Sequence, residues 1–430
     1  MTLMRAARSG ETPEEVRLVA EAEGVDVGRV LAGLRSGRII IVRNVVRAGD
    51  IQPLGIGEGL RVKINANVGT SPEFNDPEYE VEKAKVAVKY GADTVMDLST
   101  GGDLDHVRRR ILAEVKVPVG TVPIYQAGIE AVRKGKLLVD MTEDDILKVI
   151  ERHAKDGVDF MTIHAGITRQ IVQKLRRGGR IAGIVSRGGA FLASWIIRHD
   201  RENPLYSNFD QILEIAKEYD FCISLGDALR PGSIADASDW FQIQELLTVK
   251  ELVNKCWSAD VQVMVEGPGH VPLDQVEANV RIQKALCQGA PFYVLGPLVT
   301  DFAAGYDHIA GAIGGALAAM AGADFLCYVT PSEHLALPTI EDVKEGVVAA
   351  KIAAHAADIV RLGEKAKRLD LEISKARARL DWETQHKLSV DPEKARQIRL
   401  RVKPKSGACT MCGEYCVYKV LRAKPENSLI

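Results

Sequence analysis

The chain has 430 residues, of which 46% are hydrophobic and 27% are charged, and its formal net charge is -2 at pH 7. This length exceeds one ordinary domain, and the apolar content can fill a sizeable core. The small net charge gives no reason to expect nucleic acid or an anionic membrane as a partner.

The chain shows no apolar run that would suit a signal peptide or a membrane span. Residues 1–8 lack such a run, and the most apolar stretch, residues 309–323, is rich in Gly and Ala and too short to cross a bilayer. Four cysteines have apolar neighbours and are expected to be buried thiols in a reducing cytoplasm: Cys222, Cys256, Cys287 and Cys327. We therefore expect a cytoplasmic protein.

Residues 1–80 are expected to form a small amino-terminal α+β domain. Residues 12–37 suit one or two short helices, for which Thr12-Pro13-Glu14-Glu15 is a good start. The apolar run at residues 38–42 predicts a strand.

Residues 81–338 alternate short apolar runs with helical stretches. Eight runs have strand character: 94–98, 118–122, 158–163, 181–185, 221–225, 261–265, 292–295 and 325–329. Their spacing predicts an α/β fold, a (β/α)8 barrel. An open doubly wound sheet is the alternative, but no Gly-rich dinucleotide fingerprint follows the first run. Residues 339–430 are expected to be a helical carboxyl-terminal region.

Polar residues follow nearly every predicted strand. Catalytic groups in (β/α)8 barrels lie at the carboxyl ends of the strands, so we expect a polar pocket there. A helix cap or a turn could explain any one of these residues, but hardly the whole ring. The ring contains Met96, Ser99, Tyr125, His164, Ser186, Arg187, Gly188, Asp227, Arg230, Glu266, His270, Tyr293, Glu333 and His334.

Two parts of this ring suit an anionic, polar ligand. Ser186-Arg187-Gly188-Gly189 offers a hydroxyl, a guanidinium and accessible backbone N–H groups, which a phosphate needs. A simple strand-to-helix turn is the alternative. Asp227 and Arg230 could together hold a polar heterocycle and its sugar, or could form a structural ion pair.

His270 and His334 each follow a predicted strand and have carboxylates close by in the sequence. Two imidazoles with water or a substrate nitrogen would make an open zinc site. Without further support, core or surface histidines remain the alternative.

Near its end the chain carries Cys409-Thr410-Met411-Cys412-Gly413-Glu414-Tyr415-Cys416. Three ligands are one short of a closed zinc site, whereas a 4Fe-4S cluster held by three thiolates keeps one iron open for a substrate such as S-adenosylmethionine. A zinc knuckle completed by a distant ligand such as His386, or thiols without a metal, are the alternatives.

Several longer motifs resemble the phosphomethylpyrimidine synthase family of thiamine biosynthesis, which includes 5-hydroxybenzimidazole synthase paralogues. The similarity covers essentially the whole chain and includes the cysteine motif. The motifs are Lys63-Ile64-Asn65-Ala66-Asn67, Phe160-Met161-Thr162-Ile163-His164-Ala165-Gly166, Ile184-Val185-Ser186-Arg187-Gly188-Gly189, residues 266–272, Gly305-Tyr306-Asp307-His308-Ile309 and Cys327-Tyr328-Val329-Thr330-Pro331-Ser332-Glu333-His334-Leu335.

The resemblance implies a radical S-adenosylmethionine lyase on a (β/α)8 barrel. Its substrate would be 5-aminoimidazole ribotide, rearranged to 4-amino-5-hydroxymethyl-2-methylpyrimidine phosphate. The paralogues convert the same substrate to 5-hydroxybenzimidazole for anaerobic cobamide synthesis, which is the alternative. A zinc-dependent barrel hydrolase with a structural zinc knuckle is a hypothesis from a different class. The resemblance also implies a homodimer, in which a carboxyl-terminal cluster segment covers a barrel, and an electron donor such as flavodoxin or ferredoxin.

The resemblance assigns roles to particular residues. His270 and His334 match zinc ligands, and Cys409, Cys412 and Cys416 match the 4Fe-4S ligands on which catalysis depends. The positions that match substrate-binding residues are Asn67, Met96, Tyr125, His164, Ser186, Arg187, Gly188, Asp227, Arg230, Glu266 and Tyr293.

Overall fold

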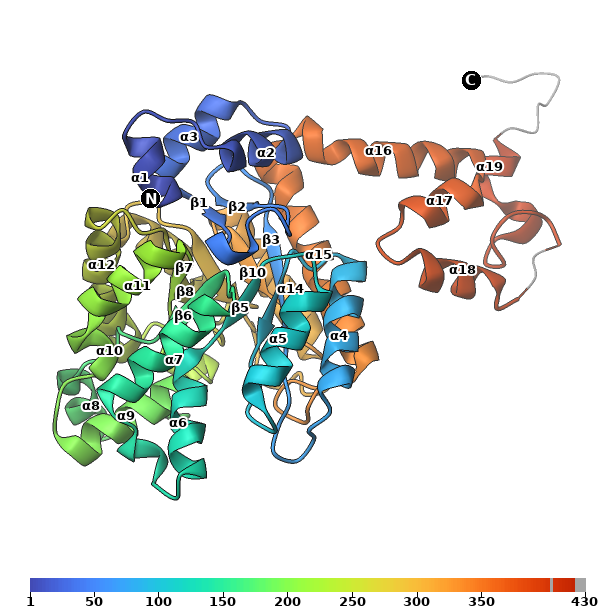
Figure 1. The fold of residues 1–430 in the computed structure, drawn as a ribbon. Helices are drawn as coiled ribbons and strands as arrows, with labels where there is room; N and C mark the ends of the chain where they lie inside the picture. Colours follow the sequence, from blue (N-terminus) through green and yellow to red (C-terminus); the bar gives the residue numbers. More distant parts are fainter. Residues whose placement is uncertain (403–404, 422–430) are drawn as a thin grey trace. The chain divides into compact units, whose positions relative to one another are not determined.

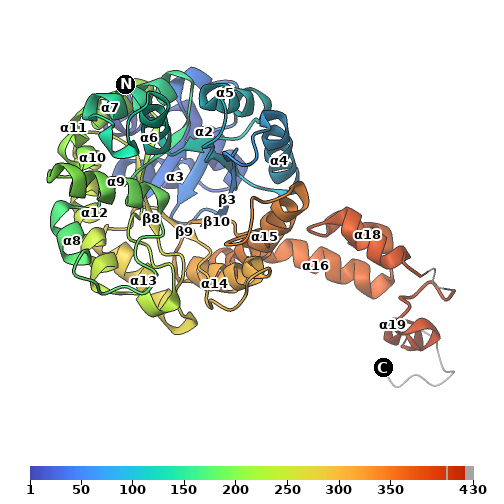
Figure 2. The same ribbon diagram turned by 90° about the horizontal axis from the view of Figure 1, so that it is seen from below.

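The computed structural model describes residues 1–402 and 405–421. The chain forms two compact units, Met1–Asp358 and Ile359–Ile430. In the first unit, eight strands form a closed parallel barrel with helices around it (Figures 1 and 2). The predicted (β/α)8 fold is therefore confirmed.

Strand β3 closes the barrel by pairing with both β4 and β10, with Asn67 opposite Met96 on one side and Ile64 opposite Leu326 on the other. The strands follow one another around the barrel in chain order. They are β3 Lys63–Val68, β4 Thr94–Asp97, β5 Val119–Thr121, β6 Phe160–Ile163, β7 Cys222–Leu225, β8 Val263–Gly267, β9 Phe292–Leu295 and β10 Phe325–Cys327.

Helices cover the outside of the barrel and seal it from water. Most begin at a capping side chain, as in α4, where Asp76 accepts hydrogen bonds from the Glu78 and Tyr79 N–H groups. The helices after β3 are α4 Pro77–Tyr90, α5 Leu104–Glu114, α6 Pro123–Arg133, α7 Glu143–Lys155, α8 Arg169–Leu175, α9 Arg187–His199, α10 Pro204–Ser207, α11 Phe209–Tyr219, α12 Trp240–Ser258, α13 Leu273–Leu286, α14 Asp307–Ala321 and α15 Ile340–Leu362.

One predicted strand is wrong, and one barrel strand was not predicted. Residues 181–185 form no strand, and Ile181 there is 80% exposed. The first barrel strand is instead β3, which lies inside the segment 1–80 that was assigned to the amino-terminal domain. The predicted division into three domains stays a prediction, but residues 63–68 belong to the barrel sheet.

Buried and half-buried carboxylates stabilise the amino ends of the barrel strands. Asp93, Asp159 and Asp324 each stand immediately before a strand. Each accepts a hydrogen bond from the backbone of the neighbouring strand, from Ile64 N at 2.9 Å, Val119 N at 2.8 Å and Phe292 N at 3.1 Å, respectively. These bonds satisfy N–H groups at the end of the sheet that would otherwise be buried without partners.

The leading segment packs at this same end of the barrel (Figure 1). It contains α1 Leu3–Arg8, α2 Glu14–Glu23, α3 Val27–Ser36 and the antiparallel pair β1 Ile39–Val42 and β2 Leu54–Gly57. Gln262, the residue before β8, exchanges two hydrogen bonds with the Ile41 backbone. Because the amino ends are covered in this way, a ligand site is left to the carboxyl ends.

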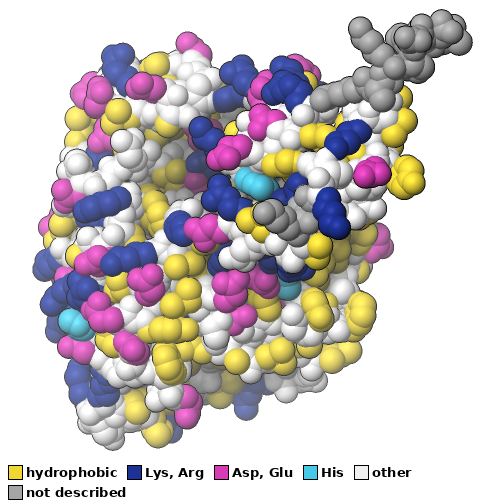
Figure 3. Space-filling model, turned by 90° about the vertical axis from the view of Figure 1, so that its right-hand side faces the viewer, with side chains coloured by type: hydrophobic (Ala, Val, Ile, Leu, Met, Phe, Trp, Pro, Cys, Tyr) yellow, Lys and Arg dark blue, Asp and Glu magenta, His cyan; other side chains and the backbone are white. Residues whose placement is uncertain are grey.

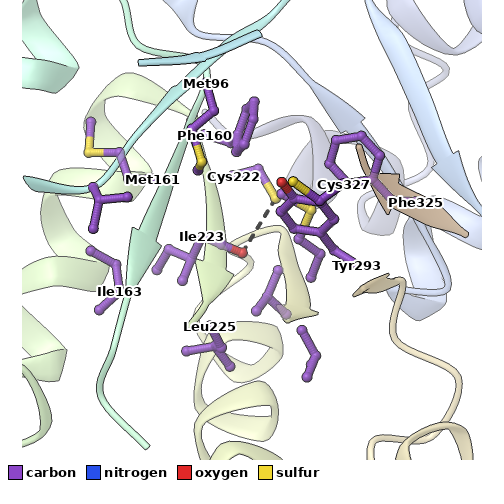
Figure 4. Close-up of a cluster of buried hydrophobic side chains, with 14 of the residues drawn as sticks. Met96, Phe160, Met161, Ile163, Cys222, Ile223, Leu225, Tyr293, Phe325 and Cys327 are labelled. Carbon is purple, nitrogen blue, oxygen red and sulfur yellow. Dashed lines mark hydrogen bonds between the residues drawn. The ribbon is translucent and has the colours of Figure 1, made fainter. Parts of the chain in front are cut away.

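The barrel interior is filled by aromatic and aliphatic side chains (Figure 4). The Tyr293 and Phe325 rings stack with centroids 4.3 Å apart, and Phe160 meets Phe325 edge-on at 6.3 Å. Gly120 makes room for Phe160, because a Cβ there would lie 2.3 Å from the ring. This layer forms the floor beneath the carboxyl-terminal pocket.

The second unit is helical, as predicted for the end of the chain. It contains α16 Glu364–Arg379, α17 Trp382–Leu388, α18 Pro392–Leu400 and α19 Val417–Val420, with the short turn η4 Gly413–Tyr415. The Trp382 indole donates to Gly407 O at 2.8 Å, and the Arg399 guanidinium lies over the Trp382 ring. These contacts anchor the loop that leads into the cysteine motif.

Acidic and basic side chains are interspersed on the face shown in Figure 3, with hydrophobic side chains between them. Among residues 1–402 and 405–421, no helix combines the length and apolar character that crossing a membrane requires.

The ion pair between Arg47 and Asp159 should be a main support of the amino end. Asp159 is fully buried, and burial raises its pKa to about 6 although Arg47 opposes this rise. Arg47→Met leaves the carboxylate without its cation, so we expect the free energy of unfolding to fall by about 3 kcal/mol in urea titrations at pH 7.5. Arg38→Met, which breaks an exposed pair with Glu58, is the control and should cost less than about 1 kcal/mol. Equal losses for the two variants would contradict the role given to Asp159.

Candidate active site

A polar pocket lies at the carboxyl ends of the barrel strands, as predicted. The strand termini of β3, β4, β6, β8 and β9 bring their side chains to it, together with the loop after β7. Eight of the eleven predicted substrate residues line it: Asn67, Met96, Tyr125, His164, Asp227, Arg230, Glu266 and Tyr293.

The other three, Ser186, Arg187 and Gly188, form the start of α9 beside this pocket. Ser186 caps the helix by accepting from Gly189 N, and its hydroxyl lies 3.2 Å from His164 Nε2. The Arg187 guanidinium lies 4.9 Å above the Tyr125 ring. A helix amino terminus with an adjacent arginine is the arrangement that binds phosphate. The motif does not follow a strand, since residues 181–185 are irregular.

His164 is held as a neutral imidazole. It is buried, and burial together with the Arg230 charge lowers its pKa to about 3. A Cβ at Gly188 would lie 2.5 Å from the His164 ring, so only glycine lets the helix start approach so closely. At neutral pH this ring can therefore orient a ligand by hydrogen bonding without contributing charge.

Asp227 and Glu266 place two buried carboxyls next to one guanidinium. Arg230 Nη1 donates to Asp227 Oδ1 at 3.1 Å, while Glu266 Oε1 accepts from the Thr162 and Ser224 hydroxyls, both at 2.7 Å. Burial raises the pKa of Asp227 to about 7 against the opposing Arg230 charge, and burial also raises the pKa of Glu266. The pair can therefore hold a proton near neutral pH and exchange it with a ligand.

A second polar network lies on the β3, β9 and β10 side of the pocket. Asn65 Nδ2 donates to the Tyr293 hydroxyl at 2.8 Å, and Asn67 Nδ2 lies 3.1 Å from the Cys327 sulfur. Burial raises the pKa of the Cys327 thiol to about 11, so the pocket holds a thiol and not a thiolate. The cysteine was correctly predicted to be buried, but its place in the pocket was not foreseen.

The two predicted zinc ligands face each other. His270 Nε2 lies 3.2 Å from His334 Nε2. On their other sides, His270 Nδ1 meets Asp301 Oδ1 at 2.7 Å and His334 Nδ1 meets Asp307 Oδ2 at 3.4 Å. Carboxylates beside both Nδ1 atoms favour the tautomer with its proton on Nδ1, which leaves the two Nε2 atoms as acceptors that a cation can bridge.

These distances fit a zinc ion. Two nitrogens bound to one tetrahedral zinc lie about 3.3 Å apart, given Zn–N bonds of about 2.0–2.1 Å. Water or substrate would complete such an open site. Within residues 1–402 and 405–421, no group of three or more His, Cys, Asp or Glu side chains is arranged to hold a metal.

The cysteine motif has the chemistry that a thiolate-bound cluster needs. Cys409 and Cys412 are partly exposed and Cys416 is buried. Backbone N–H groups of Cys412 and Met411 point at the Cys409 sulfur and lower the pKa of that thiol. Such N–H···S hydrogen bonds stabilise a thiolate and surround cluster sulfurs in iron–sulfur proteins.

Glu245 of α12 is a buried acid that sequence reasoning missed. Its Oε2 accepts from Leu229 N at 2.7 Å, in the loop that carries Asp227 and Arg230. Burial, reinforced by the charge of Asp227, raises the pKa of Glu245 to about 8. Its Oε1 has no hydrogen-bond partner among the described residues, as suits a protonated carboxyl. An isolated Glu on an amphipathic helix gives no sequence signal for such a role.

The fold and the pocket together define a (β/α)8-barrel protein with a polar site at the carboxyl ends of its strands. The chain belongs to the Radical SAM ThiC family, which it matches over residues 2–423.

Among curated proteins, the chain is 58% identical over 423 residues to the phosphomethylpyrimidine synthase of Methanopyrus kandleri, covering 98% of each chain. It is 57% identical over 435 residues to that of Ignicoccus hospitalis, covering 100% of this chain and 99% of the other. Among solved structures, a dihydropteroate synthase from Coxiella burnetii in complex with pteroic acid gives a TM-score of 0.41 at 12% identity, over 70% of this chain and 94% of the other.

The buried acid Glu245 should make stability depend on pH. Its raised pKa means that the folded state binds a proton that the unfolded state releases between about pH 4.5 and 8, so its contribution to stability is lost as pH rises through this window. Glu245→Gln removes the titration. We expect the difference in melting temperature, variant minus wild type, to increase from pH 5 to pH 8 and to stay constant above pH 9. In free energy the gain is at most about 1.4 kcal/mol per pH unit.

Glu251→Gln, on an exposed position of the same helix, is the matched control and should follow the wild type at every pH. A constant difference between Glu245→Gln and the wild type across pH 5 to 9 would show that Glu245 is charged in the folded protein.

Proposed function

We propose that this chain is a radical S-adenosylmethionine lyase that rearranges 5-aminoimidazole ribotide to 4-amino-5-hydroxymethyl-2-methylpyrimidine phosphate in thiamine biosynthesis. The observation that carries the proposal is the family match over residues 2–423, together with 58% identity to a phosphomethylpyrimidine synthase along its whole length. The geometry of the pocket also supports the proposal.

The start of α9 is the proposed phosphate site. Ser186 and Arg187 provide a hydroxyl and a guanidinium there, and the first backbone N–H groups of the helix add a positive dipole end. Arg187 also lies over Tyr125, whose ring forms a wall of the pocket. A ribotide bound by its phosphate at this point can extend its ribose and base into the pocket beside it.

The proposed base site lies between the acid pair and the neutral imidazole. Asp227 and Glu266 can accept hydrogen bonds from the amino group and ring of an aminoimidazole, and His164 offers an uncharged partner. Because burial raises the pKa of both acids, that of Asp227 to about 7, they can take up or return a proton as the ring is rebuilt. Tyr293, Met96 and Cys327 form the less polar side of this pocket.

Cys409, Cys412 and Cys416 are the proposed ligands of a 4Fe-4S cluster that binds S-adenosylmethionine. Held by these three thiolates, the cluster would supply one-electron chemistry for the cleavage of S-adenosylmethionine. The cysteine loop itself presents partly exposed thiols beside exposed Met411 and Tyr415, so a reductant can approach it. A flavodoxin or ferredoxin is the proposed electron donor, and the cytoplasm the proposed location.

His270 and His334 are the proposed zinc ligands, held in register by Asp301 and Asp307. We also propose a homodimer. In support of it, α14 carries exposed apolar side chains along one side, where Ile309, Ile313 and Met320 are about half exposed. Phe302 and Tyr306, in the segment just before this helix, are more exposed still. A face of this kind is typical of surfaces buried on association.

Product identification tests the proposed function. The anaerobically reconstituted and reduced protein should convert 5-aminoimidazole ribotide and S-adenosylmethionine to a product with the mass of the hydroxymethylpyrimidine phosphate. Omitting S-adenosylmethionine is the control and should abolish the product. A product with the mass of 5-hydroxybenzimidazole would instead assign the chain to the cobamide branch, and S-adenosylmethionine cleavage without either product would refute both.

Cys412→Ala should separate the cluster from the substrate site. We expect loss of turnover and of most reconstituted iron, measured by iron analysis and absorption, because two thiolates cannot hold the cluster. Ribotide binding should stay within about twofold of the wild type, since Cys412 is outside the pocket residues. Cys287→Ala, which removes a buried thiol at the end of α13, is the matched control and should keep both iron and turnover. Normal iron content and turnover in Cys412→Ala would overturn the cluster assignment and favour a zinc knuckle.

A further inference from the structure

Two separate segments of the chain meet at the pocket, one that lines it and one that lies beside it. One is the loop of residues 226–239 after β7, which carries Asp227 and Arg230. The other is the segment of residues 178–189, which leads into α9 and carries Ser186 and Arg187. They lie in direct contact, because a Cβ on Gly189 would come within 2.4 Å of Ala228 O. A shift of either segment therefore moves the other.

The Arg180 guanidinium joins these two segments. It makes a bidentate pair with Asp239, Nε to Oδ2 at 2.6 Å and Nη2 to Oδ1 at 2.8 Å. Nη2 also donates to Leu229 O at 2.7 Å, and Nη1 donates to Arg230 O at 3.4 Å and Gly183 O at 3.3 Å. The side chain is 0% exposed. Arg180 itself does not line the pocket.

Further contacts reinforce this junction from both sides. Asp236 accepts from Ile181 N and Ala182 N, both at 2.8 Å, which ties the same two segments together again. Asp239 also caps α12 by accepting from Gln242 N, so the partner of Arg180 is itself fixed to a long helix. Glu245, further along α12, holds Leu229 N from the opposite side of the loop. The backbone of Leu229 is thus bound at both its N–H and its carbonyl.

We propose that Arg180 is a positioning residue that couples the phosphate site at the start of α9 to the Asp227–Arg230 loop. The inference rests on the proposed function, because it concerns the two ends of a ribotide. Through Arg180, a phosphate that orders the start of α9 also orders the loop that receives the base. The planar guanidinium of Arg180 has five N–H donors and can bind both segments at once, whereas a lysine ammonium, with three donors on one nitrogen, cannot.

The test compares two ligands, 5-aminoimidazole ribotide and the riboside that lacks its phosphate, by calorimetry without S-adenosylmethionine. The wild type should bind the ribotide far more tightly than the riboside. In Arg180→Lys the dissociation constant of the ribotide should rise at least tenfold and that of the riboside by less than threefold. The ratio of the two constants, which measures the benefit of the phosphate, therefore shrinks. A merely structural defect would weaken both ligands alike and leave the ratio unchanged.

Arg43→Lys is the matched control. Arg43 lies near the amino end of β7, whereas the loop that Arg180 binds follows the carboxyl end of β7. Arg43 is a largely buried arginine that pairs with Glu15 at 3.0 Å and with Asp220, just before β7, at 3.6 Å. Its replacement should lower the melting temperature but leave the ratio as in the wild type. Asp239→Asn is a second test variant that retains the helix cap while removing the charge that orients Arg180. It should shrink the ratio in the same direction.

The possible failures are distinguishable. If the wild type binds the ribotide but Arg180→Lys and Asp239→Asn leave the ratio unchanged, the coupling is refuted and the proposed function stands. If the wild type does not bind the ribotide at all, the proposed function fails and the coupling fails with it.

Discussion

The architecture depends on carboxylates that end the barrel sheet at its amino side. A closed parallel barrel leaves a ring of backbone N–H groups at that side, and each must find an acceptor in a place with little water. Asp93, Asp159 and Asp324 provide such acceptors to the neighbouring strands, and Gln262 does the same for the leading segment. With one end closed by structure, the opposite end is free to carry polar groups whose hydrogen bonds are left for a ligand.

The pocket at the carboxyl end also contains carboxyl groups, but their surroundings differ from those at the amino end. Asp159 lies beside Arg47 and two backbone N–H groups, so its charge is compensated by the fold. Asp227 and Glu266 share a single nearby guanidinium, and burial raises the pKa of both. Burial raises the pKa of all three carboxyls, but Asp159 has a guanidinium and two backbone N–H groups as partners within the fold, whereas Asp227 and Glu266 keep the capacity to exchange a proton with a ligand. That contrast is the physical difference between the two ends of this barrel.

The sequence predicted the barrel well. Both errors in the assignment of barrel strands arose because long-range contacts, and not local composition, determine these two segments. Strand β3 was missed because polar Lys63, Asn65 and Asn67 interrupt the apolar run that a buried parallel strand normally shows. Those asparagines are polar because they serve the pocket. Residues 181–185 look like a strand because they are apolar and β-branched, but Gly183 has a φ of +65° and the backbone N–H groups of Ile181 and Ala182 bind Asp236. Local composition could not reveal the pocket contacts of β3 or the hydrogen bonds from residues 181–182 to Asp236.

The residues that line the pocket were easier to predict from the sequence than the residues that support them. Of the eight predicted residues that line the pocket, seven could be named from their place in or after predicted strands, and Asn67 from the resemblance alone. The side chains that support them, such as Arg180, Glu245 and Asp301, lie on helices and loops where no short motif marks them. Their roles depend on contacts across more than fifteen residues of chain, which appear only in three dimensions.

The two glycines at the start of α9 restrict how this protein can vary. A core position usually tolerates a change of one methyl group, because neighbouring side chains can shift. Position 188 faces the imidazole of the pocket, and position 189 faces backbone, so neither neighbour can yield without displacing a wall of the site. Even a single methyl group at either position would therefore displace the His164 imidazole or the backbone of the loop that carries Asp227. The fixed surroundings of the pocket, and not the space available in the core, limit substitution at these two positions.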